Sequence, residues 1–266
     1  MQSPSLSASA MLGLGAWLTG ALDASAQDQD VGAHGFAVLG VGLLPEYEGA
    51  DETQIVPFAV ADIDAFGLGF ELFGLKGAVD VLPGETIWKA GPAFSVTTPR
   101  DELSLYGHLL EEQDLAIEAG AFVGFETPFG GLREGALSGE VAIRQDVSGA
   151  HDGLLVTPEV KYMFAVNRLF RVGAGLSATW ASDDYMETYF NAPVAAGPDA
   201  PLYTAGAGFK NADAQVFSVL SFSERTGVFT RVSYSRLLGD AADSPIVTTD
   251  GKEDQMFYGV GAFFRF

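Results

Sequence analysis

Apolar and polar residues alternate with a period of two along several long segments of the chain. In residues 153–166, Val160 and Tyr162 share one parity. Glu159 and Lys161 share the other. Because successive side chains of a β-strand point to opposite faces, such a segment predicts a strand with one apolar and one polar face. The same alternation is present in residues 115–126, 137–144, 168–181 and 256–266.

The length of these segments favours strands that cross a membrane. They run for roughly 10–14 residues, whereas strands of soluble proteins average about 5–6. Aromatic residues such as Phe170 and Trp180 stand near the ends of an apolar face, where membrane barrels place their interfacial girdles. A soluble β-sandwich with one wet face would alternate too, but it would explain neither feature. The predicted fold is all-β, a transmembrane antiparallel up-and-down β-barrel.

The spacing of the polar stretches sets the predicted number of strands. Outer-membrane barrels have long external loops and short periplasmic turns, so two successive external loops enclose an even number of strands. Three apolar stretches lie between the predicted loops 45–53 and 98–113. The stretch 67–82 must therefore split, with Lys76-Gly77 as the expected break. This gives about 12 strands, or 10 if a hairpin in this region lies outside the wall.

Composition agrees with a barrel whose outer surface is not in water. Hydrophobic residues make up 48% and charged residues 18% of the 266 residues, which excludes a disordered chain. The net charge of −21 argues against nucleic acid, because phosphate contacts need Lys and Arg. The absence of Cys excludes disulfides, zinc thiolate sites and a Cys nucleophile. The sequence has no glycine-rich phosphate loop, and we expect no cofactor.

The N-terminus has the pattern of an export signal. Residues 11–22 form an apolar run of the length of a signal-peptide core, too short to span a membrane as a helix. Ala24 and Ala26 supply small residues at the expected cleavage site, so the mature chain would begin at Gln27. We therefore expect a signal peptide in residues 1–26 and an outer-membrane β-barrel in residues 27–266.

The last predicted strand is aromatic. Tyr258, Phe264 and Phe266 share the apolar face of residues 256–266. Outer-membrane barrels commonly close with such a strand, whose terminal Phe is read by the insertion machinery. We predict that these three residues form the barrel-insertion signal.

Charged residues on the polar parity of several strands would face the lumen. One interpretation is the lining of a selective channel. The other is a salt-bridged plug, because unpaired charges are costly in a narrow lumen. The mixture of signs leaves both interpretations open. The predicted lumen charges are Glu118, Glu140, Arg144, Glu159, Lys161, Arg171 and Arg231.

One group of residues invites a catalytic interpretation. His151 and Asp152 lie beside Ser148, and Asp183-Asp184 lie in the next predicted external loop. A His–Asp pair facing an Asp–Asp pair would resemble the omptin proteases, in which a carboxylate orients an imidazole that acts as general base. Ser, Asp and Gly are also the ordinary residues of tight turns. We predict no catalytic residue and no metal site, since the acidic loops lack the spacing of an EF-hand.

Four further blocks stand in order along the chain. They are GVGLLPEYEGADE (40–52), RQDVSGAHDGLL (144–155), WASDDYMETYF (180–190) and YSRLLGDAADSPIV (234–247). Together they resemble the MipA/OmpV family of outer-membrane proteins (MltA-interacting protein-like). The resemblance implies a β-barrel in the outer membrane of a Gram-negative bacterium, in contact with lipid and lipopolysaccharide.

The resemblance also implies a function. One family member is described as a scaffold that links a lytic transglycosylase to a peptidoglycan synthase, and others are discussed as adhesins or porin-like proteins. We expect a non-enzymatic scaffold for peptidoglycan-remodelling enzymes. A porin-like channel or an adhesin is the alternative, and an omptin-like protease is a third. The sequence leaves open the partner, the oligomeric state and whether the lumen conducts.

Overall fold

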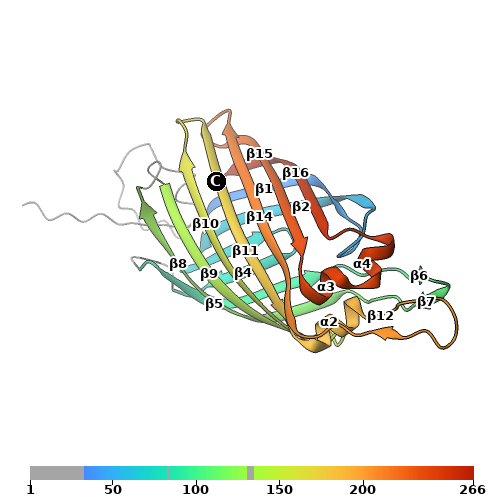
Figure 1. Cartoon of the computed structure of the whole chain (residues 1–266). Coiled ribbons are helices and arrows are strands. Elements are labelled where there is room, and N and C mark those ends of the chain that lie inside the picture. Colours follow the sequence, from blue (N-terminus) through green and yellow to red (C-terminus); the bar gives the residue numbers. More distant parts are fainter. Residues whose placement is uncertain (1–32, 83, 85, 131–134) are drawn as a thin grey trace, which may run out of the picture.

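The computed structural model describes residues 33–82, 84, 86–130 and 135–266. In these ranges twelve strands form a closed antiparallel β-barrel, in which β1 pairs with β16 (Figure 1). The cleavage-site residues Ala24, Ala26 and Gln27 lie outside the described residues. The strands of the wall are β1 (His34–Pro45), β2 (Thr53–Ala65), β3 (Leu68–Phe73), β4 (Lys76–Asp80), β5 (Trp88–Thr97), β8 (Ala116–Phe129), β9 (Gly135–Asp146), β10 (Leu154–Ala165), β11 (Phe170–Ala181), β14 (Gly208–Ser221), β15 (Thr226–Leu237) and β16 (Asp254–Arg265).

The barrel confirms the predicted fold and its twelve strands, so the ten-strand alternative is wrong. The stretch 67–82 does split, into β3 and β4, but the turn lies at Gly74-Leu75 rather than at Lys76-Gly77. Gly74 has a φ of 63°, a left-handed conformation that glycine adopts without strain. Lys76 instead begins β4, where it pairs with Ser95 of β5. Both strands are short, so this hairpin spans only part of the height of the wall.

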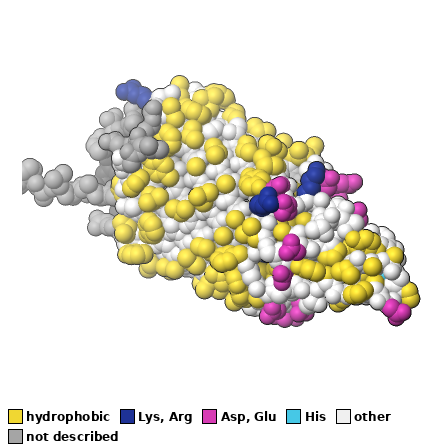
Figure 2. All heavy atoms as spheres, viewed as in Figure 1, with side chains coloured by type: hydrophobic (Ala, Val, Ile, Leu, Met, Phe, Trp, Pro, Cys, Tyr) yellow, Lys and Arg dark blue, Asp and Glu magenta, His cyan; other side chains and the backbone are white. Residues whose placement is uncertain are grey.

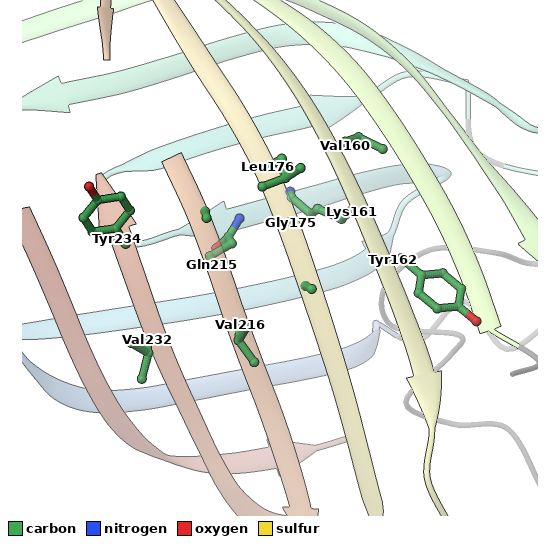
Figure 3. Close-up of a pocket in the computed structure, with 11 residues that line it drawn as sticks. Val160, Lys161, Tyr162, Gly175, Leu176, Gln215, Val216, Val232 and Tyr234 are labelled. Carbon is green, nitrogen blue, oxygen red and sulfur yellow. The ribbon is translucent and has the colours of Figure 1, made fainter. Parts of the chain in front are cut away.

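Side chains alternate between the outer surface and the lumen as the sequence predicts. Val123 of β8 and Leu176 of β11 are 55% and 60% exposed on the outside, whereas Glu118 of β8 is buried on the inside. Figure 2 shows the resulting hydrophobic surface of the barrel. A hollow of about 560 Å³ interrupts this surface between β10 and β15 (Figure 3). Acidic side chains gather toward the end that carries the long loops (Figure 2).

The two ends of the barrel differ. Short turns join the strands at the end where β1 begins and β16 ends. The other end carries the long connections, which the sequence indicated only as polar loops. None of the described helices is long and apolar enough to cross a membrane. The elements described in these connections are α2 (Asp183–Phe190), α3 (Gly239–Asp243), α4 (Pro245–Asp250), β6 (Leu103–Leu105) paired with β7 (His108–Leu110), and β12 (Ala192–Pro193) paired with β13 (Leu202–Tyr203).

The connection between β5 and β8 is an extended hairpin that prolongs the wall. Its turn, Tyr106-Gly107, has φ values of 52° and 81°, which are typical of a type I′ turn. Leu105 is buried in a cluster with Ala192 and Ile246, so the hairpin leans onto β12 and α4. Strand register continues unchanged from the wall into this hairpin through the pairs Thr97–Ala116, Arg100–Gln113 and Leu103–Leu110.

Candidate functional site

The helices α2, α3 and α4 pack together at the long-loop end and form a cap. The buried side chains of α2 share one face of the helix, and they are Tyr185, Met186, Tyr189 and Phe190. They cluster with Leu237 at the end of β15 and with Val247 of α4. The hydroxyl of Ser244 donates a hydrogen bond of 2.7 Å to the carbonyl of Phe190, which ties α4 to α2.

A partly buried ionic contact ties the cap to the barrel. The hydroxyl of Tyr185 donates a 2.8 Å hydrogen bond to Glu48, which lies in the connection between β1 and β2. The ammonium of Lys210 in β14 donates to the same carboxylate and lies 5.0 Å from the centre of the Tyr185 ring. Three segments far apart in the sequence therefore meet at one carboxylate. Because a buried charge needs partners, this contact holds the cap in one position.

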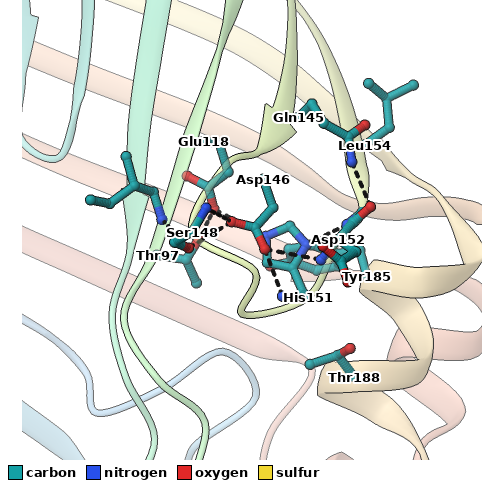
Figure 4. A network of polar contacts seen from close by, with 12 residues as sticks. Thr97, Glu118, Gln145, Asp146, Ser148, His151, Asp152, Leu154, Tyr185 and Thr188 are labelled. Carbon is teal, nitrogen blue, oxygen red and sulfur yellow. Dashed lines mark hydrogen bonds and ion pairs between the residues drawn. The ribbon is translucent and has the colours of Figure 1, made fainter.

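His151 lies beneath α2, as Figure 4 shows. Its side chain is 0% exposed, and its ring packs edge-on against Tyr185 and Tyr189 at 4.9 and 5.6 Å between centres. Nδ1 accepts a 2.9 Å hydrogen bond from the backbone N–H of Gly153, which leaves the ring proton on Nε2. Nε2 lies 3.4 Å from Glu118, whose carboxylate also accepts a 2.6 Å bond from Thr97.

Asp146 organises the loop that carries His151. Its carboxylate accepts hydrogen bonds from the hydroxyl of Ser148 at 2.6 Å and from the backbone N–H groups of His151 and Asp152 at 2.7 and 2.9 Å. Asp152 has a φ of 51°, which Asp tolerates better than most residues. Ser148, which lies beside the His–Asp pair of the protease hypothesis, thus acts as a partner of a turn carboxylate.

The residues of the protease hypothesis have separate partners in the structure. Asp183 accepts a 2.6 Å hydrogen bond from the backbone N–H of Ala207, and Asp152 contributes its backbone carbonyl to Gln145 at 2.5 Å. The imidazole of His151 contacts Glu118 instead. In the described ranges, no group of three or more His, Cys, Asp or Glu residues could hold a metal ion. The absence of catalytic residues stays a prediction.

Burial sets the ionisation of the tyrosines in α2. Desolvation and the neighbouring Glu48 raise the pKa of Tyr185 well above its ordinary value. Desolvation and the nearby Glu118 raise the pKa of Tyr189 as well. Both are neutral in the folded protein at pH values where an unfolded chain, with a tyrosine pKa of about 10, already ionises. Their contribution to stability is therefore complete below about pH 10 and is lost as the pH rises through the folded pKa values.

This difference predicts an alkaline opening of the cap. In an absorbance titration of detergent-solubilised protein at alkaline pH, we expect a late ionisation step that coincides with loss of near-ultraviolet circular dichroism. A Tyr185→Phe/Tyr189→Phe variant should reduce the amplitude of that step. Ionisation of all 8 tyrosines in one step near pH 10 would contradict the buried cap.

Inside the lumen, a partly buried lysine joins three strands. The ammonium of Lys89 in β5 lies 2.6 Å from Glu71 of β3 and 3.5 Å from Glu126 of β8. These residues are additional to the lumen charges predicted from the sequence. Their parity in the sequence does predict that they face the lumen. Lys89 alternates with the apolar positions of residues 86–97, and Glu126 does the same in β8.

The predicted lumen charges occupy different levels of the barrel. Lys161 pairs with Glu159 at 2.8 Å, and Glu159 also accepts a 2.7 Å bond from Gln215. The guanidinium of Arg231 stacks on Phe73 at 4.1 Å. Glu118 belongs to the polar contacts of the cap described above. Glu140 and Arg144 lie on β9, and Arg171 lies near the short-turn end of β11. That these residues act together as one network stays a prediction.

Lys89 should be needed for barrel stability. Replacing it in Lys89→Met leaves the buried carboxylate of Glu126 and the partly buried carboxylate of Glu71 without their cation. The free energy of unfolding should fall by about 3 kcal/mol, the low end of the range for a fully buried pair. Urea unfolding in detergent, followed by heat-modifiable mobility on gels, measures the change. Lys76→Met, at an exposed lumen lysine, is the matched control and should change stability little. If Lys89→Met unfolds at the wild-type urea concentration, the ion pair contributes nothing.

Apolar side chains fill the lumen near the short-turn end and form a lumen floor. A cavity of about 50 Å³ lies between this floor and the pair of Lys161 and Gln215. Phe217 and Phe229 stack with ring centres 6.5 Å apart. Such packing leaves little room for water along this part of the described lumen. The buried residues of the floor are Phe36, Val38, Val60, Met163, Phe217, Val219, Phe229 and Phe263.

The described short turns present exposed apolar residues. Phe66 is 87% exposed, and its φ of 57° together with the φ of 72° at Gly67 is typical of a type I′ turn. Bulky residues rarely adopt a positive φ, so Phe66 carries strain as well as exposure. This set, the short-turn rim, comprises Phe66, Leu82, Phe129, Leu169 and Phe222.

The aromatic residues of the last strand lie on the outer face of β16. Tyr258 and Phe264 are exposed there, and Phe266, which directly follows β16, is exposed as well. Phe264 and Phe266 lie near the short-turn rim. This placement follows the predicted parity. Their role as an insertion signal stays a prediction.

A family model described as "MltA-interacting protein MipA" matches residues 37–266. The match spans every strand of the barrel apart from the first residues of β1. No curated protein matches the chain.

Among solved structures, the chain is similar to outer-membrane proteins at low identity. In-vitro folded OmpT, an outer membrane protein of Vibrio cholerae, is 10% identical, with 91% of this chain and 100% of that chain covered and a TM-score of 0.39. OmpT of Vibrio cholerae expressed in the outer membrane is 9% identical, with the same coverage of both chains and a TM-score of 0.38. OccK11 (OpdR) of Pseudomonas aeruginosa is 9% identical, with coverage of 88% and 95% and a TM-score of 0.29.

Proposed function

Because the chain belongs to the MltA-interacting protein MipA family, we propose that this outer-membrane barrel is a non-enzymatic scaffold for peptidoglycan-remodelling enzymes. The family description names a protein partner, MltA. We infer that this barrel binds a partner of that kind, a lytic transglycosylase. A peptidoglycan synthase would be the second partner. The proposed location is the outer membrane of a Gram-negative bacterium.

The observation that carries the proposal is the exposed short-turn rim. Short turns of outer-membrane barrels face the periplasm, where cell-wall enzymes work. Turns that served only to connect strands would be rich in Gly, Asn and Asp, but these place Phe66, Phe222 and Leu169 at the surface. Exposed aromatic and aliphatic anchors are what protein interfaces use.

The interior supports a binding role over catalysis. The imidazole of His151 is buried beneath α2, where a substrate would first have to displace the cap. A general base must reach the proton that it removes, and this ring instead faces Glu118 and two tyrosines. His151 thus serves the packing of the cap.

A channel is the second candidate function. The charged residues of the middle lumen favour it, because Lys89, Lys161 and Glu159 would line a path for ions. The lumen floor and the cap oppose it, since both fill the path with packed side chains. The structure therefore favours the scaffold.

A pull-down tests the scaffold directly. Detergent-solubilised barrel is immobilised and incubated with periplasmic extract and, separately, with purified lytic transglycosylase. Retention of the transglycosylase is the expected result, and it should persist at high salt because the rim is apolar. If the transglycosylase is retained neither at low salt nor at high salt, the scaffold loses its main support.

A further inference from the structure

The outer wall carries the hollow of about 560 Å³ that Figure 3 shows, and its lining includes two alanines, Ala174 and Ala214. Strand register places Val160, Leu176, Ala214 and Tyr234 in one row across β10, β11, β14 and β15. Tyr162, Ala174, Val216 and Val232 form the adjacent row. Ala174 and Ala214 lie diagonally to each other, and their short side chains leave the outer surface recessed between them. Tyr162 and Tyr234 stand at opposite ends of the hollow.

The next row of side chains toward the long-loop end lies just beyond the lining of the hollow. The next row contains Ala178 beside Ala212, and Ala212 pairs with Arg236 of β15. Arg236 shares the outward parity of Val232 and Tyr234 and is exposed. Tyr234, which lines the membrane-facing hollow, is therefore two residues from an exposed cation on the same face of β15.

Two carboxylates accompany this cation. The guanidinium of Arg236 lies 2.8 Å from Asp254 and 2.6 Å from Glu253. The hydroxyl of Tyr234 donates to Asp254 as well. Guanidinium groups suit phosphate, and paired carboxylates suit a divalent cation. The group therefore has one positive and two negative charges. The guanidinium can bind a phosphate, and the two carboxylates, which would otherwise repel that anion, can bind a divalent cation that accompanies it.

We propose that the hollow and Arg236 form a binding site for lipopolysaccharide, which goes beyond the scaffold function. One acyl chain lies over Ala174 and Ala214, and a phosphate of the headgroup contacts Arg236. A divalent cation bridges that phosphate to Asp254 and Glu253. The long-loop end of an outer-membrane barrel faces outward, so Arg236 stands at the leaflet where lipopolysaccharide resides.

Shape and apolar surface explain why an acyl chain would bind in the hollow. Between the tyrosines the wall is recessed, and a flexible chain from the membrane can fill the recess and bury the exposed faces of Leu176 and Val216. A larger side chain at either alanine would occupy the same space. Filling the recess from the protein side therefore removes the acyl-chain contact while keeping the surface apolar.

The test measures lipid that co-purifies with the full barrel in mild detergent, by native mass spectrometry. The Ala174→Phe/Ala214→Phe variant should retain about tenfold less lipopolysaccharide than wild type. Ala121→Phe, at another outward alanine on β8, is the matched control and should retain the wild-type amount. Arg236→Gln, and a chelator added to wild type, should each lower retention about fivefold.

Each outcome bears on the site. Heat-modifiable mobility shows that every variant is folded before its lipid is measured. Equal retention by the double variant and the Ala121→Phe control overturns the proposal. Retention of glycerophospholipid in place of lipopolysaccharide also overturns it, because the leaflet assignment would then be wrong. Scaffold binding uses the opposite end of the barrel, so the pull-down with lytic transglycosylase should succeed with all of these variants.

Discussion

In planar bilayers the wild-type barrel should stay closed, whereas a variant in which both the lumen floor and the cap are opened should carry a steady ion current. The floor is opened by Phe217→Ala/Phe229→Ala, which removes two stacked rings from the buried cluster. The cap is opened by replacing residues 183–206, which contain α2, with a short Gly-Ser loop, while α3 and α4 stay in place. Apolar packing excludes water and ions, so either barrier alone should keep the path closed.

The experiment separates the two barriers by comparing four proteins: wild type, each single change and the combination. Large core truncations cost about 3–5 kcal/mol each, so folding is verified before conductance is recorded. Appearance of current only in the combination is the expected result. Large stable openings in the wild type would contradict the filled lumen and would make the channel the better function.

The Phe66→Asn variant should bind the partner enzyme at least about tenfold more weakly, because the substitution removes an interface anchor. The barrel itself should become more stable. Asn-Gly is the preferred pair for a type I′ turn, and Asn tolerates the positive φ that strains Phe66. We expect a stabilisation of about 0.5–1 kcal/mol from relief of that strain. A loss of binding with a gain in stability cannot be attributed to misfolding.

The measurement pairs affinity for the lytic transglycosylase with urea unfolding. Leu109→Asn is the control, because Leu109 is an exposed apolar residue in β7, at the opposite end of the barrel. It should leave binding unchanged. If Phe66→Asn binds as wild type does, the aromatic ring serves the membrane interface instead of the partner.

The alternation of side chains was enough to predict the wall. Parity placed Glu118 and Arg144 inside and Val123 outside because a strand in a barrel has only two faces. The break between β3 and β4 was predicted two residues late. Lys76, the expected break, is instead the first residue of β4 and pairs with Ser95 of β5. Gly74, with its positive φ, marks the actual turn.

The contacts of the cap were out of reach of the sequence. The apolar spacing of Tyr185, Met186 and Tyr189 does indicate a helix, but it lies in a segment that looked like a polar loop. Nothing local in the sequence joins Glu48 to Lys210, because that contact depends on how the barrel closes. His151 drew notice for chemistry, and its burial became visible only once α2 lay over it.

The link between Glu48 and Lys210 has a consequence for the order of assembly. These residues are 162 positions apart, and Tyr185 is 137 positions from Glu48. Contacts between neighbouring strands form at short sequence separation, whereas contacts this distant come late. The cap can therefore close only after the strands from β2 to β14 are in place. A barrel that stalls during insertion would expose the aromatic face of α2, and periplasmic quality-control proteases could recognise it as unfinished.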